Sequence, residues 1–129
     1  MRSSNIDIKT TIRGSLPRIP FVEMAEAVLG NSYELSLVVC GDALAQRMNI
    51  EHRKKSYRPN VLSFPLSKTE GEIFLNVRCA AREAKRGGIS RQKRLALLYV
   101  HGLFHLKGLD HSDHMEREEQ RILRRFDLA

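Results

Sequence analysis

The sequence predicts an α+β fold, with a mixed sheet of about four strands packed by helices. Short Leu-, Val- and Ile-rich segments have strand character, and longer segments with apolar residues three or four positions apart are typical of helices. The two kinds of segment interleave irregularly, which favours a mixed sheet over a regular alternation. A chain of 129 residues can bury one core, so we expect a single domain over residues 1–129.

The N-terminal region predicts one strand and one helix. Residues 5–13 alternate Ile with polar side chains, as in a half-buried strand, and Gly14 and Pro17 end this pattern. We expect a helix over residues 20–29, because Pro favours the first turn of a helix and Gly30 closes it.

A second strand and a short helix are predicted next. Residues 33–40 are rich in Leu and Val, which is typical of a strand. The dipeptide at 41–42 supplies a turn, with Asp42 as the expected N-cap of the helix. The apolar residues of this helix are Ala43, Leu44, Ala45 and Met48.

The middle of the chain predicts a basic loop and two more strands. Residues 53–59 carry four Lys and Arg side chains and a proline, which favours a loop. A short strand over residues 60–65 should stop at its own Pro65, since proline cannot donate to a sheet. Residues 72–76 predict a fourth strand, antiparallel to a neighbour.

The C-terminal half predicts three helices. The first includes the alanines of residues 80–84 and ends at the glycines 87–88. Ser90 is expected to cap a longer central helix, which Gly108 ends. A last helix is expected over residues 113–126, and we interpret its charged stretch as a solvated face.

Composition limits the classes of protein that fit. Apolar residues make up 42% and charged residues 29% of the chain, which argues against disorder. No apolar run approaches the roughly 20 residues that span a bilayer, and residues 1–7 lack the apolar block of a secretory signal. Cys40 and Cys79 stand far apart, so we expect small buried thiols and a reducing, cytoplasmic location.

The net charge of +7 makes a polyanionic partner plausible. Basic residues gather between positions 78 and 94, where only Glu83 opposes them. Four of them can share a helix face that follows a phosphate backbone, and the alternative is an ordinary solvated helix. Because aromatic residues are scarce, we favour backbone recognition over base reading. The four are Arg78, Arg82, Lys85 and Arg86.

Three histidines form the most informative pattern. His101 and His105 are one helical turn apart, so both imidazoles face the same side of the central helix. Gly108 can take a positive φ and turn the chain back, which can bring His111 to the same ion. Three neutral ligands leave a coordination position for water, whose pKa such a site lowers to about 7. A single histidine would have an ordinary role, as we expect for His52 and His114, but three with this spacing predict a metal site.

The histidine spacing also matches a zinc-protease pattern, His-Glu-x-x-His-x-x-Gly-x-x-His. The position of the protease general base is Gly102, which cannot take a proton. Glycine at this position would let a bulky substrate or another backbone approach the metal. Proteolysis therefore ranks third among the possible functions.

The same residues resemble a known family. His101-Gly102-x-x-His105-Leu106-x-Gly108-x-Asp110-His111 looks like the signature of the YbeY family of bacterial endoribonucleases that mature ribosomal RNA. Three further segments are similar to family motifs, and together the matches cover residues 48–123. They are Met48-Asn49-x-x-His52-Arg53 followed by Asn60-Val61-Leu62-Ser63-Phe64-Pro65, then Gly71-Glu72-Ile73, and Met115-Glu116-x-x-Glu119-x-x-Ile122-Leu123.

The resemblance implies one Zn²⁺ ion held by His101, His105 and His111, with the first two on a central helix. It also implies a single-strand-specific endoribonuclease that acts at the 3′ end of 16S ribosomal RNA and in ribosome quality control. The expected partners are ribosomal RNA, the small ribosomal subunit and assembly proteins, with no membrane or DNA. Three histidines suit Zn²⁺, although Ni²⁺ or Cu²⁺ would also bind.

Two residues are candidates for catalysis. Arg53 stands at the family's recurrent arginine, and a guanidinium can bind a phosphate and stabilise charge at phosphorus; the alternative is a surface arginine. Asp110 ranks first as a residue that orients a ligand histidine, with a base or a helix cap as alternatives. Ser63 is a weaker candidate for lining the cleft.

The chain departs from the family pattern at Ser56, Pro59, Lys107 and Leu109, so its contacts to substrate are expected to differ from the family's. A rival function from another class is a non-catalytic RNA-binding assembly factor, in which the metal ties the last helix to the core. This rival predicts salt-dependent RNA binding without turnover.

Overall fold

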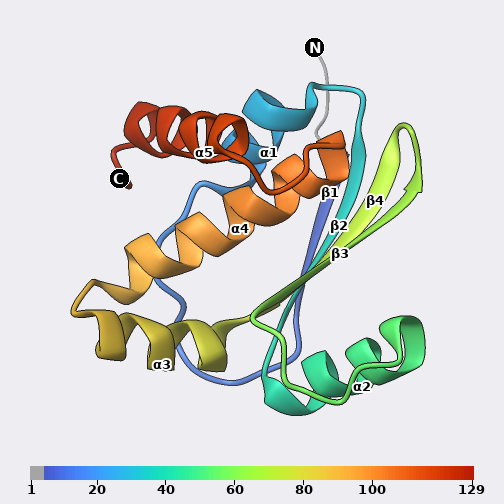
Figure 1. The fold of residues 1–129 in the computed structure, drawn as a ribbon, viewed down its shortest axis with the longest axis vertical. Helices are drawn as coiled ribbons and strands as arrows, with labels where there is room; N and C mark the ends of the chain where they lie inside the picture. The colour runs from blue at the N-terminus through green and yellow to red at the C-terminus, as the bar shows by residue number, and fades with distance from the viewer. Residues whose placement is uncertain (1–4) are drawn as a thin grey trace.

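The computed structural model describes residues 5–129. They form a four-stranded mixed sheet, in the order β1-β2-β4-β3, with helices on both faces, so the predicted fold class is confirmed (Figure 1). We predicted from residues 1–7 that the chain has no secretory signal, and residues 1–4 of that segment lie outside the described range. The elements are β1 (Ile6–Thr10), α1 (Phe21–Leu29), β2 (Glu34–Cys40), α2 (Asp42–Arg53), β3 (Val61–Ser67), β4 (Glu70–Asn76), α3 (Val77–Gly87), α4 (Arg91–Lys107) and α5 (Asp113–Arg125).

Strand direction separates β3 from the other strands. β1, β2 and β4 run parallel, whereas β3 pairs antiparallel with β4, as expected for the fourth predicted strand. The prediction that β3 stops at Pro65 is wrong. The strand continues to Ser67, with a register shift between these two residues. An edge strand tolerates proline, because the missing N–H need not face the neighbouring strand.

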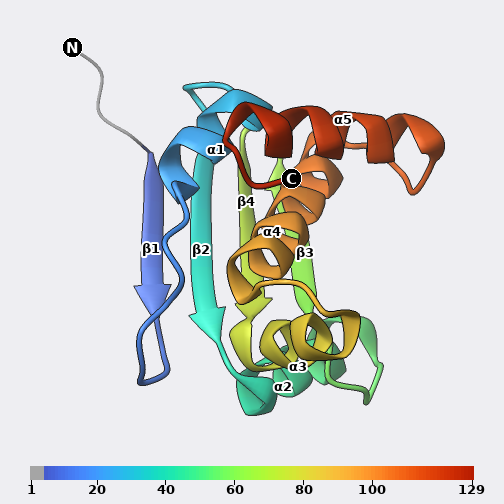
Figure 2. The same ribbon diagram turned by 90° about the vertical axis from the view of Figure 1, so that its left-hand side faces the viewer.

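The main core lies between one face of the sheet and helices α1, α4 and α5 (Figure 2). Alternate residues of β2 and β4, including Leu37 and Ile73, point to this side and are fully buried. Tyr99 of α4 lies among them, and its hydroxyl donates to the carbonyl oxygen of Phe21 at 2.8 Å, which fixes α1 against α4. α4 is thus the central helix that the sequence predicted.

α2 covers part of the opposite face, where Val38, Cys40, Leu62 and Phe74 form a smaller apolar cluster with Ala45. This helix is longer than predicted and includes Arg53, which we had placed in the loop. Its N-cap is Gly41 rather than Asp42. The Asp42 carboxylate instead accepts hydrogen bonds from Arg82 and Asn76, and these partners outcompete the local cap.

The predicted ends of the central helix are confirmed. The Ser90 hydroxyl accepts from the backbone N–H of Lys93, and Gly108 ends α4 with φ +104°. Cys40 is buried as expected, and burial raises the pKa of its thiol to about 11. Cys79 is only half-buried. Within residues 5–129, none of the helices has the length and apolar character to cross a bilayer.

Candidate metal centre and cleft

The structure brings the three predicted histidines together. His101 and His105 lie on one face of α4, and His111 reaches them from the segment between α4 and α5. The three ring centroids are 4.5 to 4.8 Å apart. One ligand nitrogen from each ring can be chosen so that all three lie within 4.8 Å of one another. The turn at Gly108 therefore brings His111 to the other two histidines, as predicted.

This donor set fits a divalent metal ion. The Nε2 atoms of His101 and His105 are 3.0 Å apart, close to the separation of about 3.3 Å that tetrahedral bonds of 2.0–2.1 Å give. Burial lowers the pKa of His105, and the neighbouring His101 and His111 lower it further. A histidine with a lowered pKa stays neutral at pH 7, which is the form that binds a metal. All three histidines line one cleft.

A buried glutamate from α5 orients the site, and the sequence analysis missed it. Glu119 is 6% exposed, and its Oε2 accepts a hydrogen bond from His101 Nδ1 at 2.6 Å. That bond leaves Nε2 of His101 to face His105. We had interpreted the charged stretch of α5 as solvated. Glu119 instead shares the buried face of this helix with Met115, Ile122 and Leu123, and this three-and-four spacing was the signal available in the sequence.

Of the two roles that we expected for Gly102, the structure shows the close approach of another chain segment, β3, rather than of a substrate. A Cβ atom at this position would lie 2.9 Å from the Ser63 hydroxyl and 3.2 Å from a methyl of Val61. Glycine therefore lets α4 lie directly on β3, and Ser63 Oγ donates to the Gly102 carbonyl oxygen at 3.1 Å. The side chain that a metalloprotease needs as its general base has no space here.

A cleft of about 760 Å³ contains the histidines and joins several elements. Arg53 and Tyr57 line it from the end of α2 and the following loop, and Ser63 lines it from β3. Arg94 and Glu119 line it from α4 and α5. The predicted candidates Arg53 and Ser63 thus share a cleft with the metal centre.

Asp110 is placed differently. Its side chain is exposed and does not line the cleft, although its charge favours protonation of His105. The alternative that Asp110 caps the last helix is wrong, because Ser112 is the N-cap of α5 and its hydroxyl accepts from Met115 N–H. His52 packs against Phe64 and His114 is exposed, in line with the ordinary roles expected for both.

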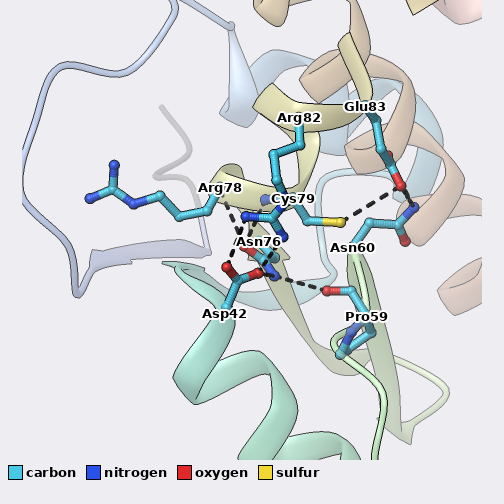
Figure 3. A network of polar contacts seen from close by, with 8 residues as sticks. All are labelled: Asp42, Pro59, Asn60, Asn76, Arg78, Cys79, Arg82 and Glu83. Carbon is cyan, nitrogen blue, oxygen red and sulfur yellow. Dashed lines mark hydrogen bonds and ion pairs between the residues drawn. The ribbon is translucent and has the colours of Figure 1, made fainter. Parts of the chain in front are cut away.

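A polar network fixes the end of the loop that leads into β3 (Figure 3). The buried Asn76 amide donates to the carbonyl oxygen of Pro59 at 3.1 Å and to Asp42 at 2.9 Å. Asn60 donates to the carboxylate of Glu83 at 3.2 Å. Residues 54–58 of the loop are exposed, whereas Pro59 is buried and the C-terminal end of the loop is tied to α2 and α3.

The same network occupies part of the basic cluster between residues 78 and 94. Arg82 forms two hydrogen bonds with Asp42, at 2.7 and 2.9 Å, so Asp42 opposes these cations as well as Glu83. Arg94 pairs with Glu83 at 2.8 Å and is held at the cleft wall. The predicted phosphate-following face is therefore partly neutralised within the fold.

Comparison with known proteins identifies relatives over most of the chain. Residues 3–127 match a family model described as Endoribonuclease YbeY. A Geobacter metallireducens protein named Endoribonuclease YbeY is 37% identical over 98 residues, 69% of this chain and 65% of the relative. A protein of the same name from Aromatoleum aromaticum is 37% identical over 81% of this chain and 70% of its own length. A third, from Campylobacter jejuni, is 32% identical over 84% of this chain and 86% of its own length.

One solved structure shares the fold. A Thermotoga maritima protein determined in solution superposes with a TM-score of 0.68 over 95% of this chain and 91% of that protein, at 20% identity. This similarity supports the arrangement of sheet and helices described above.

Proposed function

Because this chain belongs to the YbeY endoribonuclease family, we propose that it is a zinc-dependent endoribonuclease that cuts single-stranded RNA. The observation that carries the proposal is the convergence of His101, His105 and His111 in a cleft that Arg53 also lines. The proposed substrate class is ribosomal RNA, including the 3′ end of 16S ribosomal RNA, and the proposed setting is ribosome quality control in the cytoplasm. A net charge of +7 supports a polyanionic substrate, and the small ribosomal subunit is the proposed partner.

His101, His105 and His111 would hold the ion. A bound zinc ion polarises a phosphoryl oxygen and makes water a stronger acid. Glu119 fixes the ring of His101 through its Nδ1 proton, so this ligand needs little reorganisation. Arg53 would bind a phosphate oxygen and stabilise the charge that develops at phosphorus during cleavage. Asp110, exposed beside the site, stays a candidate for orienting His105.

The test is cleavage of a single-stranded ribosomal RNA fragment by metal-loaded protein, stripped protein and the His105→Ala variant. We expect cleavage by the loaded protein and its loss in the other two preparations. His114→Ala is the matched control, because His114 is exposed and outside the metal cluster. Equal cleavage by all preparations would remove the catalytic role of the metal. Elemental analysis of the native protein identifies the ion.

The rival assembly-factor function keeps one supporting observation, since His111 lies between α4 and α5 and a metal would tie these helices together. It predicts that the loaded protein binds RNA without cutting it. Arg53→Ala separates the two functions, because it should abolish cleavage in the enzyme and weaken only binding in the rival.

A further inference from the structure

We propose that Tyr57 forms a nucleobase subsite, in which its ring stacks on a base of single-stranded RNA while the neighbouring Arg53 holds a phosphate. This inference rests on the proposed function and adds to it a residue that positions the substrate. Tyr57 is 52% exposed, although it is a large aromatic residue and lines the same cleft as the three histidines.

The contrast with the other tyrosines supports a role in binding. Tyr33 and Tyr99 are 7% and 0% exposed, and both belong to the main core. The Tyr57 ring belongs to neither apolar cluster of the described residues. An aromatic ring beside an arginine offers a π-face that any base can stack on, without reading its sequence.

The loop presents Tyr57 in a fixed position. The buried Asn49 side chain donates from Nδ2 to the Tyr57 carbonyl oxygen at 3.0 Å, and Gln46 donates to the Ser56 carbonyl oxygen at 2.7 Å. Two residues later, Asn76 holds the Pro59 carbonyl oxygen. Because the backbone is anchored on both sides, stacking on Tyr57 requires little ordering of the loop.

The surroundings of the ring suit a nucleotide. Arg53 Nη1 donates to the Tyr57 hydroxyl at 3.4 Å, so a guanidinium and an aromatic ring stand side by side in the cleft. Lys54, Lys55 and Arg58 flank them along the loop, which carries no acidic residue from position 53 to 60. Arg94, Leu97 and Leu98 of α4 line the same cleft. An anionic backbone with apolar bases matches this combination of charge and apolar surface.

The first test is equilibrium binding of 2′-O-methyl oligouridylate and oligoadenylate, and of an abasic strand of equal length. Tyr57→Leu should weaken binding of the base-bearing strands about 5-fold or more and leave the abasic strand unchanged, while Tyr57→Phe should bind normally. The matched control is Ile89→Ala, which truncates an exposed apolar residue outside the cleft. Equal losses in Tyr57→Leu and Tyr57→Phe would overturn the proposal, since they would assign the effect to the hydroxyl.

Intrinsic fluorescence gives an independent signature. The chain has three tyrosines and no tryptophan, and only Tyr57 among the three is exposed. Base-bearing RNA should quench the tyrosine emission of the unchanged protein. Tyr57→Phe should keep its affinity and lose the quenching. Quenching that persists in Tyr57→Phe would overturn the proposal.

Cleavage distinguishes failure of the subsite from failure of the proposed function. Normal affinity and normal cleavage in Tyr57→Leu would overturn the subsite and leave the endoribonuclease intact. Quenching and base-dependent affinity in a protein without cleavage would support the subsite and contradict the enzyme. A protein that binds none of these strands would contradict both.

Discussion

Glu119 acts on the metal centre through a single hydrogen bond, so its charge can be tested without changing its shape. We predict that Glu119→Gln lowers the affinity for Zn²⁺ about 10- to 100-fold, because the neutral amide holds the His101 Nδ1 proton less strongly. Competition with a chromophoric chelator measures the affinity. Glu118→Gln is the control, since Glu118 lies on the same helix and pairs with Arg121. Equal affinities in the two variants would contradict the orienting role.

Gly102 is required by the contact between α4 and β3. We predict that Gly102→Ala lowers the free energy of unfolding by about 1–3 kcal/mol, because its Cβ would press on Ser63 and Val61. Gly87→Ala in α3 is the control, since a Cβ there meets no atom within 4 Å among the described residues. This control should be neutral or gain up to about 1 kcal/mol. Urea unfolding of both variants measures the difference, and matching values would refute the packing role.

Among single residues, the sequence identified those whose role depends on spacing. His101, His105 and His111 follow from helical geometry and one glycine, and the structure groups them as predicted. Glu119 was missed because its partner is 18 positions away, and because the charged residues around it hid its three-and-four spacing with the apolar residues of α5. Tyr57 was missed because the cleft that it lines is formed by four elements, α2, β3, α4 and α5.

At the scale of elements, the ion pair between Asp42 of α2 and Arg82 of α3 makes the free energy of unfolding depend on pH in the acidic range. The Arg82 guanidinium lowers the pKa of Asp42 to about 2 from its usual 3.8. The folded state therefore binds a proton less readily than the unfolded state. The stabilisation is complete above about pH 4 and is lost as the pH falls towards 2.

We predict that Asp42→Asn lowers the free energy of unfolding by about 1 kcal/mol at pH 7 and has a much smaller effect at pH 2, where Asp42 is about half protonated in the folded state and almost fully protonated in the unfolded state. This value is small because the Arg82 side chain is 46% exposed and solvent screens the ion pair. Thermal unfolding at several pH values gives the comparison. A constant difference from pH 2 to 7 would show that the charge of Asp42 is not responsible.

Element boundaries were predictable where local chemistry decides them. Ser90 and Gly108 bound α4 because a hydroxyl cap and a positive φ act within one turn. The boundaries predicted at Pro65 and Asp42 were wrong, because the tertiary environment decides each case. β3 tolerates Pro65 as an edge strand, and Asp42 is recruited by Arg82 from α3. Predictions from neighbouring residues in the sequence do not include these long-range contacts.

The whole molecule carries a net charge of +7, which should appear in the salt dependence of RNA binding. The logarithm of the binding constant should fall linearly with that of the salt concentration, with a slope of about −0.7 per phosphate neutralised. Arg53→Ala should reduce this slope by about one phosphate. Lys68→Ala, in the turn between β3 and β4, is the control and should leave it unchanged. A slope that Arg53→Ala does not alter would exclude a phosphate contact by Arg53.

The fold class was predictable from the whole sequence, because strand and helix patterns interleave irregularly and the sheet is mixed as a result. The strand order β1-β2-β4-β3 was not predicted, since it depends on pairing between segments far apart in the chain. A single domain over residues 1–129 stays a prediction.

The nitrogens that would hold the ion come from residues 101–111, whereas the cleft also needs Arg53 and Tyr57, from the end of α2 and the loop that follows it. The two parts of the site therefore differ in how much of the chain must be folded to make them. Short-range contacts form at little entropic cost, but contacts across forty or more residues require the tertiary structure. As the concentration of denaturant rises, the chain should release RNA at a lower concentration than it releases the ion. RNA binding then reports on loss of the tertiary structure, and ion binding reports on loss of the local structure of residues 101–111.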